Sequence, residues 1–392
     1  MRILIIQPWI RLGGAETLSL ELSAALERRG HEVPIAALFV DPAGLPDIVR
    51  DRAYVLPPRR LAERFARSRT LSFLLGPFVL LGLVARASAG IDVLDPHNLP
   101  GPIVAAIVGP VRGIPVVWNL NEVPVPLPPE QAQRIGLVER LVWIVGAALA
   151  RWSSRVPKEV LVLDEKTKRS VRAHYGLEAT IAMPGLRVES FEATAPRRAV
   201  GGVTRLLCVG KLHPQKNVVL AIETVAELRR RGRAVALRIV GDGPLRAELA
   251  LAAARLGVAD AVSFRALLSL AELAREYAAA DVLLVTPTGH QAWGLTPFEA
   301  IAAGTPSVVS DEAGAAEVLA AHDAALVTAA APTAFADAVE RLVADPALAE
   351  GLVRNGRALL RDELTWPRYA ERCERAFRAA GGRRVWSGRA AP

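Results

Sequence analysis

The chain has 392 residues, of which 52% are hydrophobic and 22% charged, and its formal net charge at pH 7 is +8. Because a single hydrophobic core stops growing at roughly 250 residues, this length predicts two domains, and the composition excludes a globally disordered chain. The two cysteines, Cys208 and Cys373, are too few for a disulfide framework or a cysteine-based zinc site.

The first half of the chain alternates short apolar runs with helical patterns. No basic leader or small-residue cleavage site precedes the first run, so we expect no export signal and a cytoplasmic location. Strands and helices that alternate at this spacing imply right-handed crossovers and a parallel sheet. The segments are Ile3–Gln7, Ala15–Arg29, Glu32–Phe39, Val93–Asp95, Ile103–Val111, Val116–Asn119, Leu137–Trp152, Val160–Leu163 and Lys166–Tyr175.

The stretch from Arg50 to Arg86 is strongly basic and also contains an apolar run. It holds eight arginines but only two acidic residues, Asp51 and Glu63. Within it, Leu71–Ala85 is almost wholly apolar. That run is shorter than the ~20 residues that a membrane-spanning helix needs. Two interpretations stay open: a buried core helix with a solvated basic flank, or a segment that lies on an anionic membrane surface.

A linker is predicted between Pro184 and Gly202, because this segment is rich in Pro, Gly, Thr and Arg and lacks regularly spaced apolar residues. We therefore predict a first domain of residues 1–195, a second of residues 196–365, and a C-terminal segment of residues 366–392 whose helix suits a return to the first domain. The second alternating set comprises Arg205–Val209, Val218–Arg231, Ala236–Val240, Leu245–Leu256, Ala261–Phe264, Ser269–Ala279, Val282–Val285, Pro297–Ala303, Ser307–Ser310, Ala315–Ala320 and Trp366–Ala380.

The two halves together predict an α/β fold made of two Rossmann-like, doubly wound parallel-sheet domains. Sheets of this kind bind ligands outside the carboxyl ends of their strands. Two such domains in tandem therefore predict a ligand cleft between them.

Two glycine-containing loops come directly before predicted helices. Gly13 and Gly14 follow the first strand, and paired glycines before a helix can cradle a phosphate, although this signal is weak by itself. The string GKLHPQKN places Gly210, Lys211 and Lys216 at the end of the strand Arg205–Val209. Two cations beside a helix amino terminus suit a diphosphate, and the alternative is a pair of surface lysines.

A third glycine loop, GDGP, follows the strand Ala236–Val240. Gly241 and Gly243 permit a sharp turn and a close approach of the backbone to a ligand, and the alternative is an ordinary tight turn. A nicotinamide-type fingerprint would need a further glycine at position 246, which is arginine. That motif is therefore absent.

The most informative stretch is GHQAWGLTPFEAIAAGTPSVVS, which spans Gly289 to Ser310. Thr296 and Glu299 have the spacing of a capping box, so Glu299 can serve merely as a cap for its own helix. The functional alternative is a carboxylate that accepts two hydroxyl protons, as recognition of a ribose requires.

Four motifs in order carry a resemblance to a known family. They are GGAE at 13–16, GKLHPQKN at 210–217, IVGDGP at 239–244 and WGLTPFEAIAAGTPSVV at 293–309. Together they resemble the family 4 retaining glycosyltransferases of the GT-B fold. The resemblance covers nearly the whole chain and is strongest from Arg205 to about Glu317.

The resemblance implies roles for individual residues. Lys211 and Lys216 match the basic pair that holds the donor diphosphate, and Glu299 matches the carboxylate that holds the donor ribose. Gly13 and Gly14 match the loop that closes over the phosphate, and Trp366 an aromatic at the start of the crossover helix. The remaining donor-binding candidates are Gly210, Gly241, Gly243, Trp293, Gly294 and Leu295.

The chain departs from the family pattern at its expected catalytic residues. The first glutamate of the family's pair is replaced by Gln291, and a neutral amide cannot stabilise a developing positive charge as a carboxylate does. Asn121 stands where many relatives place a histidine. His97 is then the remaining candidate acid or base of the first domain, although a lone loop histidine is more often structural. The turn before the linker, Pro184–Arg187, is also altered.

These observations predict a metal-independent glycosyltransferase that transfers a sugar with retention from a nucleotide diphosphate donor to a saccharide or lipid-linked acceptor. Cell-envelope or polysaccharide synthesis is the expected setting, with an anionic membrane surface as a further candidate partner and no nucleic acid. No metal or other cofactor is expected, because Lys211, Lys216 and helix amino termini stabilise the leaving diphosphate. The alternatives are a nucleotide-sugar epimerase on the same fold and a catalytically weakened donor-binding scaffold.

Overall fold

The computed structural model describes residues 1–11, 14–41, 52–121, 137–192, 202–288 and 293–381. The chain forms two compact units: Met1–Gly185 together with the chain from Trp366 onward is unit 1, and Leu186–Thr365 is unit 2. The division therefore falls ten residues before the boundary that the sequence analysis places after residue 195. Residues 193–201, in the second half of the predicted linker Pro184–Gly202, lie outside the described residues.

Unit 1 is built on parallel strands. Four strands form one sheet in the order β5-β3-β1-β6, and three form another in the order β7-β8-β9. A parallel bridge between Leu94 and Val116 connects the two sheets, so the combined order follows the doubly wound pattern. The bounds are β1 (Ile3–Ile6), β3 (Ile35–Ala36), β5 (Tyr54–Val55), β6 (Val93–Pro96), β7 (Val117–Leu120), β8 (Glu159–Val162) and β9 (Thr180–Ile181), with a separate pair β2 (Trp9–Ile10) and β4 (Phe39–Val40).

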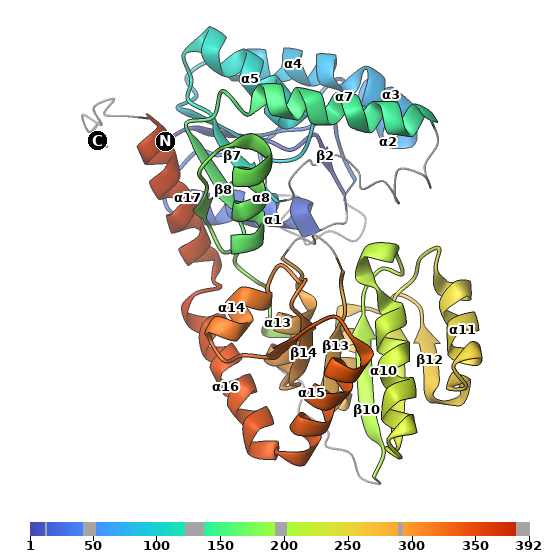
Figure 1. Cartoon of the computed structure of the whole chain (residues 1–392). Coiled ribbons are helices and arrows are strands. Elements are labelled where there is room, and N and C mark those ends of the chain that lie inside the picture. Colours follow the sequence, from blue (N-terminus) through green and yellow to red (C-terminus); the bar gives the residue numbers. More distant parts are fainter. Residues whose placement is uncertain (12–13, 42–51, 122–136, 193–201, 289–292, 382–392) are drawn as a thin grey trace. The chain divides into compact units, whose positions relative to one another are not determined.

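Helices cover both faces of the unit 1 sheet (Figure 1). On one face α4 packs on α5, and α5 packs on α7; on the other face α1 packs on α17. Helices on both faces bury a parallel strand on both sides, so such a strand is apolar throughout. All four residues of Ile3–Ile6 are accordingly apolar and buried. The helices are α1 (Gly14–Glu27), α2 (Arg59–Arg67), α3 (Arg69–Leu74), α4 (Gly76–Ala87), α5 (Gly101–Arg112), α7 (Leu137–Ser153), α8 (Glu165–Tyr175) and α17 (Trp366–Gly381).

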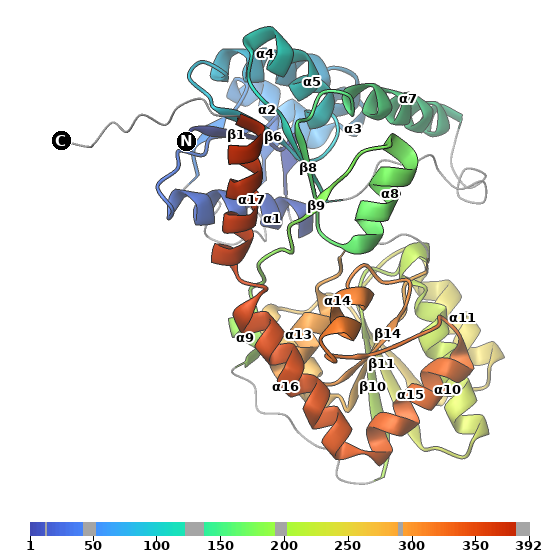
Figure 2. The ribbon, with the colours of Figure 1, turned by 60° about the vertical axis from the view of Figure 1, so that its left-hand side comes forward.

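The C-terminal helix α17 is an integral part of unit 1, and Figure 2 shows it beside α1. Tyr369, Cys373 and Phe377 are fully buried on its inner side. Gly185 lies against the first residue of the helix, since a Cβ there would come within 2.5 Å of the Trp366 backbone nitrogen. Apolar burial and close backbone packing thus hold α17 in place.

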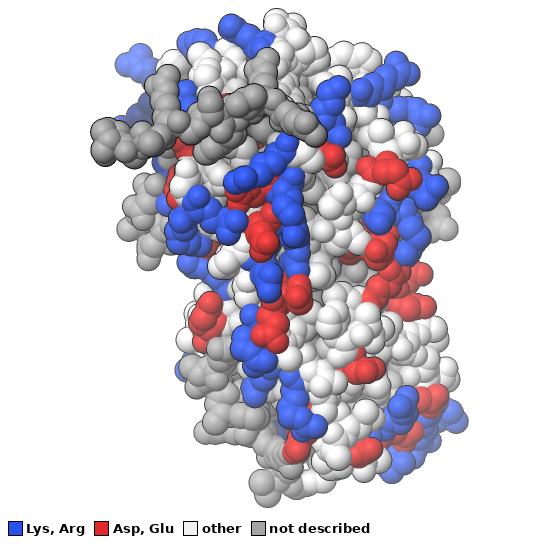
Figure 3. Space-filling model, turned by 90° about the vertical axis from the view of Figure 1, so that its left-hand side faces the viewer, with Lys and Arg blue, Asp and Glu red and all other residues white. Residues whose placement is uncertain are grey.

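The outer side of α17 carries charges of both signs, which alternate along the helix in Figure 3. Glu371 pairs with Arg368 and Arg375 at helical spacing. Glutamates thus neutralise arginines along this helix.

Unit 2 contains one six-stranded parallel sheet in the order β12-β11-β10-β13-β14-β15. In chain order this is 3-2-1-4-5-6, so the strand order reverses between β10 and β13. The α/β fold with two parallel-sheet units that the sequence predicts is confirmed. The bounds are β10 (Thr204–Val209), β11 (Val235–Val240), β12 (Val262–Arg265), β13 (Val282–Val285), β14 (Ser307–Ser310) and β15 (Leu326–Thr328).

The unit 2 helices bury both faces of its sheet. One core cluster joins Leu206 and Ile239 of the sheet to Ile222, Val225 and Phe335 of the covering helices. The structure has β15, α15 and α16 between Ala320 and Trp366, where no element is predicted from the sequence. The helices are α9 (Glu189–Glu192), α10 (Val218–Arg230), α11 (Arg246–Arg255), α12 (Leu270–Ala279), α13 (Thr296–Ala303), α14 (Ala316–Ala321), α15 (Pro332–Ala344) and α16 (Pro346–Asp362).

Candidate functional site

The candidate site lies in unit 2 at the carboxyl ends of β10 and β13, the point where the strand order reverses. Folds of this class bind ligands at this position. The loop after β10 contains a short 3-10 helix, Pro214–Lys216. Two hydrogen bonds tie it to the loop after β13: Thr286 Oγ1 donates to the Lys216 carbonyl at 2.9 Å, and Thr288 N donates to the Gln215 carbonyl at 3.3 Å.

Gly241 and Gly243 bring the loop after β11 against the loop after β10. Gly241 has a φ of 145°, and a Cβ there would lie 1.9 Å from the Gly210 carbonyl oxygen. A Cβ on Gly243 would lie 2.5 Å from the Leu212 carbonyl oxygen. Both positions therefore require glycine because backbone packs directly on backbone. Their contact with a ligand stays a prediction.

Lys216 lines a small hollow together with Thr286, Trp293, Gly294 and Thr296. The hollow encloses about 20 Å³, which is room for about one water molecule, so a larger ligand would lie mostly outside it. The side chain of Lys211 is exposed. The structure thus brings Lys216, Trp293 and Gly294 to one hollow.

The ammonium group of Lys216 is half-buried and has no ion pair or hydrogen bond to any side chain or carbonyl among the described residues. Burial lowers the pKa of this group, and the nearby charge of Lys211 lowers it further. A sheltered cation without a counter-ion is energetically unfavourable, and a bound anion would relieve that cost.

Glu299 lies in the first turn of α13, but it does not form the capping box that its spacing allows. The N-cap of α13 is Leu295, and no side-chain capping hydrogen bond is present, so the capping interpretation is wrong. Instead, Tyr277 of α12 donates its hydroxyl to Glu299 Oε2 at 2.7 Å. Burial raises the pKa of Glu299, and the tyrosine hydrogen bond acts in the opposite direction. The sequence analysis did not identify Tyr277.

The residues before α13 shape the wall of the hollow. Trp293 is 3% exposed and stacks on Phe298, with ring centroids 5.3 Å apart and an interplanar angle of 10°. Its indole N–H has no hydrogen-bond partner among the described residues. Gly294 has a φ of 76°, which favours glycine, and Leu295 is exposed. Gln291 lies outside the described residues.

The unit 1 candidates form a separate polar cluster at the carboxyl ends of β6 and β7. His97 is buried, with Nε2 3.1 Å from Asp95 Oδ2 and Nδ1 3.4 Å from Asn121 Nδ2. A neutral ring that donates from Nε2 and accepts at Nδ1 satisfies both contacts. Since neither ring nitrogen is then left for a substrate, this geometry favours a structural role for His97. Asp95 was missed by the sequence analysis.

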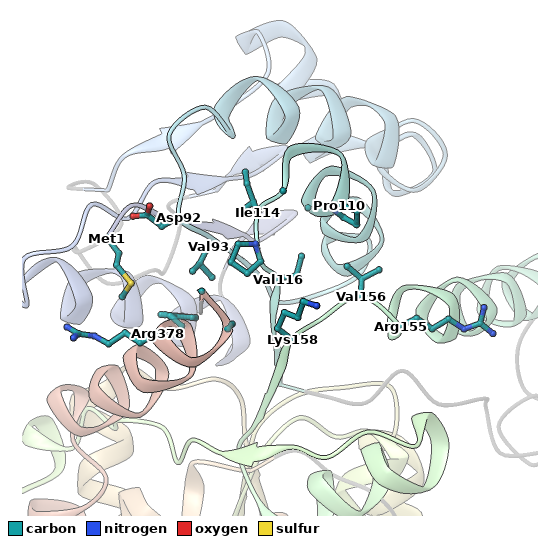
Figure 4. A pocket seen from close by; sticks show the side chains of 16 residues that line it. Met1, Asp92, Val93, Pro110, Ile114, Val116, Arg155, Val156, Lys158 and Arg378 are labelled. Carbon is teal, nitrogen blue, oxygen red and sulfur yellow. The ribbon is translucent and has the colours of Figure 1, made fainter. Parts of the chain in front are cut away.

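Gly13 lies outside the described residues, and Gly14 begins α1. In unit 1 a pocket of about 760 Å³ lies instead at the amino ends of the strands, where Met1, Val93, Val116 and Lys158 line it (Figure 4). Because parallel sheets bind ligands at the opposite edge, this pocket does not define the site, despite its volume.

The arginine-rich stretch divides between core and surface. In α4, Leu80 and Val84 are buried in the core, whereas Phe78 is 72% exposed. Leu74 and Leu75 before it are also exposed, and Arg50 lies outside the described residues. Within the part of the chain that the structure describes, no helix has both the length and the apolar character needed to cross a bilayer.

Among the described residues, no three His, Cys, Asp or Glu side chains gather as a metal would require. Both cysteines are buried and unpaired, and burial raises the pKa of Cys208 to about 11. Cys208 therefore lies under the Lys216 hollow as a neutral thiol.

Two family models match the chain. Residues 12–184 match the model described as Glycosyltransferase Family 4, and residues 192–359 match Glycosyl transferases group 1. The chain is 29% identical to a 2-deoxystreptamine glucosyltransferase of Streptomyces kanamyceticus, over 70% of this chain and 73% of that protein. It is also 29% identical to a GDP-mannose-dependent phosphatidylinositol monomannoside mannosyltransferase of Mycolicibacterium smegmatis, over 68% and 78%.

Solved structures share the fold of the whole chain. HepE of Anabaena, solved in complex with UDP and glucose, has a TM-score of 0.69 at 16% identity and covers 96% of this chain and 98% of its own. A sucrose-phosphate synthase from Thermosynechococcus elongatus has a TM-score of 0.70 at 19% identity, over 96% and 98%. These likenesses concern the fold alone.

Proposed function

Because the chain belongs to the family 4 glycosyltransferases and has their GT-B fold, we propose that it transfers a sugar from a nucleotide diphosphate donor bound in unit 2. The recipient is a saccharide or a lipid-linked acceptor, and the anomeric configuration is retained. By their names, two relatives glycosylate 2-deoxystreptamine and phosphatidylinositol monomannoside. These names fit a saccharide or a lipid-linked acceptor that carries hydroxyl groups.

One observation carries the proposal: the sheltered ammonium of Lys216 at the carboxyl edge between β10 and β13, which has no partner among the described residues. A nucleotide diphosphate supplies the anion that this group lacks. The charge on the diphosphate increases as the bond to the sugar breaks, so Lys216 stabilises the leaving group more strongly in the transition state than in the ground state. Lys211 adds a second cation nearby.

Glu299 supports the same donor class. Its carboxylate lies in the first turn of α13, where it can accept hydrogen bonds from the ribose hydroxyls. Gln291 replaces the family's first glutamate, so we expect its amide to bind sugar hydroxyls rather than to stabilise positive charge at the anomeric carbon. Lysine charges take the place of a metal in this proposal.

A panel of UDP, GDP, ADP and TDP sugars tests the donor site. We expect one nucleotide family to raise the unfolding temperature in excess EDTA, because a ligand that binds only the folded state stabilises it by mass action. Free nucleoside should have little effect. No stabilisation by any member would contradict a donor site, and stabilisation or turnover that requires added magnesium or manganese would contradict the lysine mechanism.

We further propose that unit 1 meets its acceptor at the inner face of a membrane. The adjacent helices α4, α5 and α7 expose apolar side chains, including Phe78 at 72%, Val111 at 78% and Ile144 at 58%. Exposed arginines Arg64 and Arg67 of α2 flank them. Apolar insertion combined with attraction to anionic headgroups is how peripheral proteins bind such surfaces.

A double variant, Leu74→Ser with Phe78→Ser, tests this surface. We expect it to reduce co-flotation with vesicles that contain about one-third phosphatidylglycerol by roughly tenfold, since it removes two exposed apolar side chains of the kind whose burial favours binding. Leu267→Ser in unit 2, which removes a side chain that is 79% exposed, is the matched control. Equal flotation of the double variant and the wild type would contradict the proposal.

A further inference from the structure

We infer that Tyr277 is a positioning residue for the donor ribose: its hydroxyl occupies one oxygen of Glu299 and directs the other oxygen to the ribose. This inference rests on the proposed function. It adds a residue that no motif of the sequence identifies, because Tyr277 lies 22 positions before Glu299 in a different helix.

Packing holds the phenol of Tyr277 in one place. Tyr277 has no exposed surface, and Phe191 of α9 contacts its ring edge-on, with centroids 5.7 Å apart and an interplanar angle of 76°. Thr305, directly after α13, donates its hydroxyl to the Tyr277 carbonyl at 2.6 Å. This hydrogen bond joins the ends of α12 and α13, and the packed ring places the Tyr277 hydroxyl against Glu299.

Glu299 uses only part of its hydrogen-bonding capacity within the protein. The 2.7 Å contact from Tyr277 reaches Oε2, and no described residue donates to Oε1. A carboxylate has about four acceptor positions, so Oε1 can still accept from ribose hydroxyls. Because α13 has no capping box, the carboxylate is not occupied by a capping hydrogen bond to its own helix.

The charge state of Glu299 depends on few neighbours. Burial raises its pKa, and the Tyr277 hydroxyl counteracts that shift by bonding to the ionised form. The packed elements carry further charged or titratable groups, none of which is a cause of the Glu299 pKa shift: the buried thiol of Cys208 on β10, Glu189 on α9, Glu272, Arg275 and Glu276 on α12, and Glu350, Arg354, Arg357, Arg361 and Asp362 on α16. The Arg357 guanidinium donates to carbonyls at the opposite end of α13.

Removal of the phenolic hydroxyl should therefore raise the pKa of Glu299 further. The ionised carboxylate accepts both ribose protons, so nucleotide affinity should rise with pH through that pKa and level off above it. In Tyr277→Phe the rise should occur at higher pH than in the wild type. A residue that only stabilised the fold would not move this profile.

The test measures calorimetric binding of UDP and GDP, each beside its 2′-deoxy form, from about pH 5 to about pH 8. For Tyr277→Phe we expect roughly tenfold weaker ribonucleotide binding at the acidic end, partial recovery at the alkaline end, and a smaller ratio of ribo to deoxy affinity. Tyr175→Phe, which changes a half-buried tyrosine of unit 1 whose ring packs against Trp118, is the control and should match the wild type.

Glu299→Gln provides a second variant with Tyr277 intact, in case the phenylalanine variant does not fold. It should lose both the pH-dependent rise and the ribose discrimination. A folded Tyr277→Phe with wild-type affinity, pH profile and ribose ratio would overturn the inference while leaving the donor site in place. If the wild type binds no nucleotide at any pH, the proposed function itself fails.

Discussion

Lys216→Ala should lose about 10²- to 10³-fold in kcat/KM for sugar transfer, the range measured when one preorganised charge-stabilising group is removed from an active site. The loss should fall on kcat as well as KM, because the diphosphate gains charge as the sugar departs. Steady-state kinetics with the donor that the nucleotide panel identifies would measure both parameters.

Two lysine variants make this prediction specific. Lys211→Ala should lose less, because its side chain is exposed and water already screens its charge. Lys158→Ala in unit 1, at the amino edge of the sheet, should match the wild type. The prediction fails if kcat/KM of Lys216→Ala lies within about twofold of that of Lys158→Ala. Because the expected loss is much larger, this result would exclude a diphosphate role for Lys216.

Glu374→Ala should destabilise unit 1 by about 2 kcal/mol, because it removes the buried carboxylate of an ion-pair cluster that links α17 to the turn after α1 and whose arginines are partly exposed. The Glu374 side chain is 8% exposed, pairs with Arg29 at 2.7 Å and contacts His31 at 3.3 Å. Arg378 of the same helix also pairs with it. Thermal unfolding should show a decrease of roughly 4–8 °C for a unit of this size.

The pH dependence of the Glu374 effect has a definite sign. Burial by itself would raise the pKa of Glu374, but hydrogen bonds from Arg29 and Arg378 outweigh it and lower the pKa. Its contribution to stability is therefore present above its ordinary value of 4.5 and is lost as the pH falls through the lower folded value. The difference between variant and wild type should shrink in acid.

Glu371→Ala is the matched control for Glu374→Ala. Glu371 lies on the same helix and pairs with Arg368 and Arg375, but its side chain is 38% exposed. An exposed pair contributes at most ~1 kcal/mol, so its unfolding temperature should hardly change. Equal effects of the two substitutions would show that burial of the Glu374 cluster does not stabilise unit 1.

Most of the unit 2 strands could be predicted because each is a short apolar run bounded by turn residues. β10, β13 and β14 fall on the predicted segments. β15 and helices α15 and α16 were not assigned, since the alanine-rich region after Ala320 shows little contrast between its apolar and polar positions. Helix α13 was predicted, but its cap was not, because Thr296 became its first residue and Leu295 its N-cap.

The candidate site was predictable where its residues lie next to each other in sequence. Gly210, Lys211 and Lys216 follow one strand, so their position at the sheet edge could be read from the chain. The requirement for glycine at position 241 could not be predicted from the sequence, because it arises from contact with the Gly210 carbonyl of a neighbouring loop. His97 was predicted as an acid or base only because of its residue type. Its hydrogen-bond partners in the structure, Asp95 and Asn121, favour a structural role.

The sequence by itself determined the two parallel sheets, the family, and the cationic loop after β10. Local periodicity, turn residues and motif order encode these features over short stretches of chain. Only the tertiary structure decided that the Lys216 ammonium is sheltered and has no partner among the described residues, that Tyr277 donates to Glu299, and that Glu374 links α17 to the turn after α1. Burial and hydrogen-bond partnership arise between segments that are distant in sequence, so they exist only once the chain has folded.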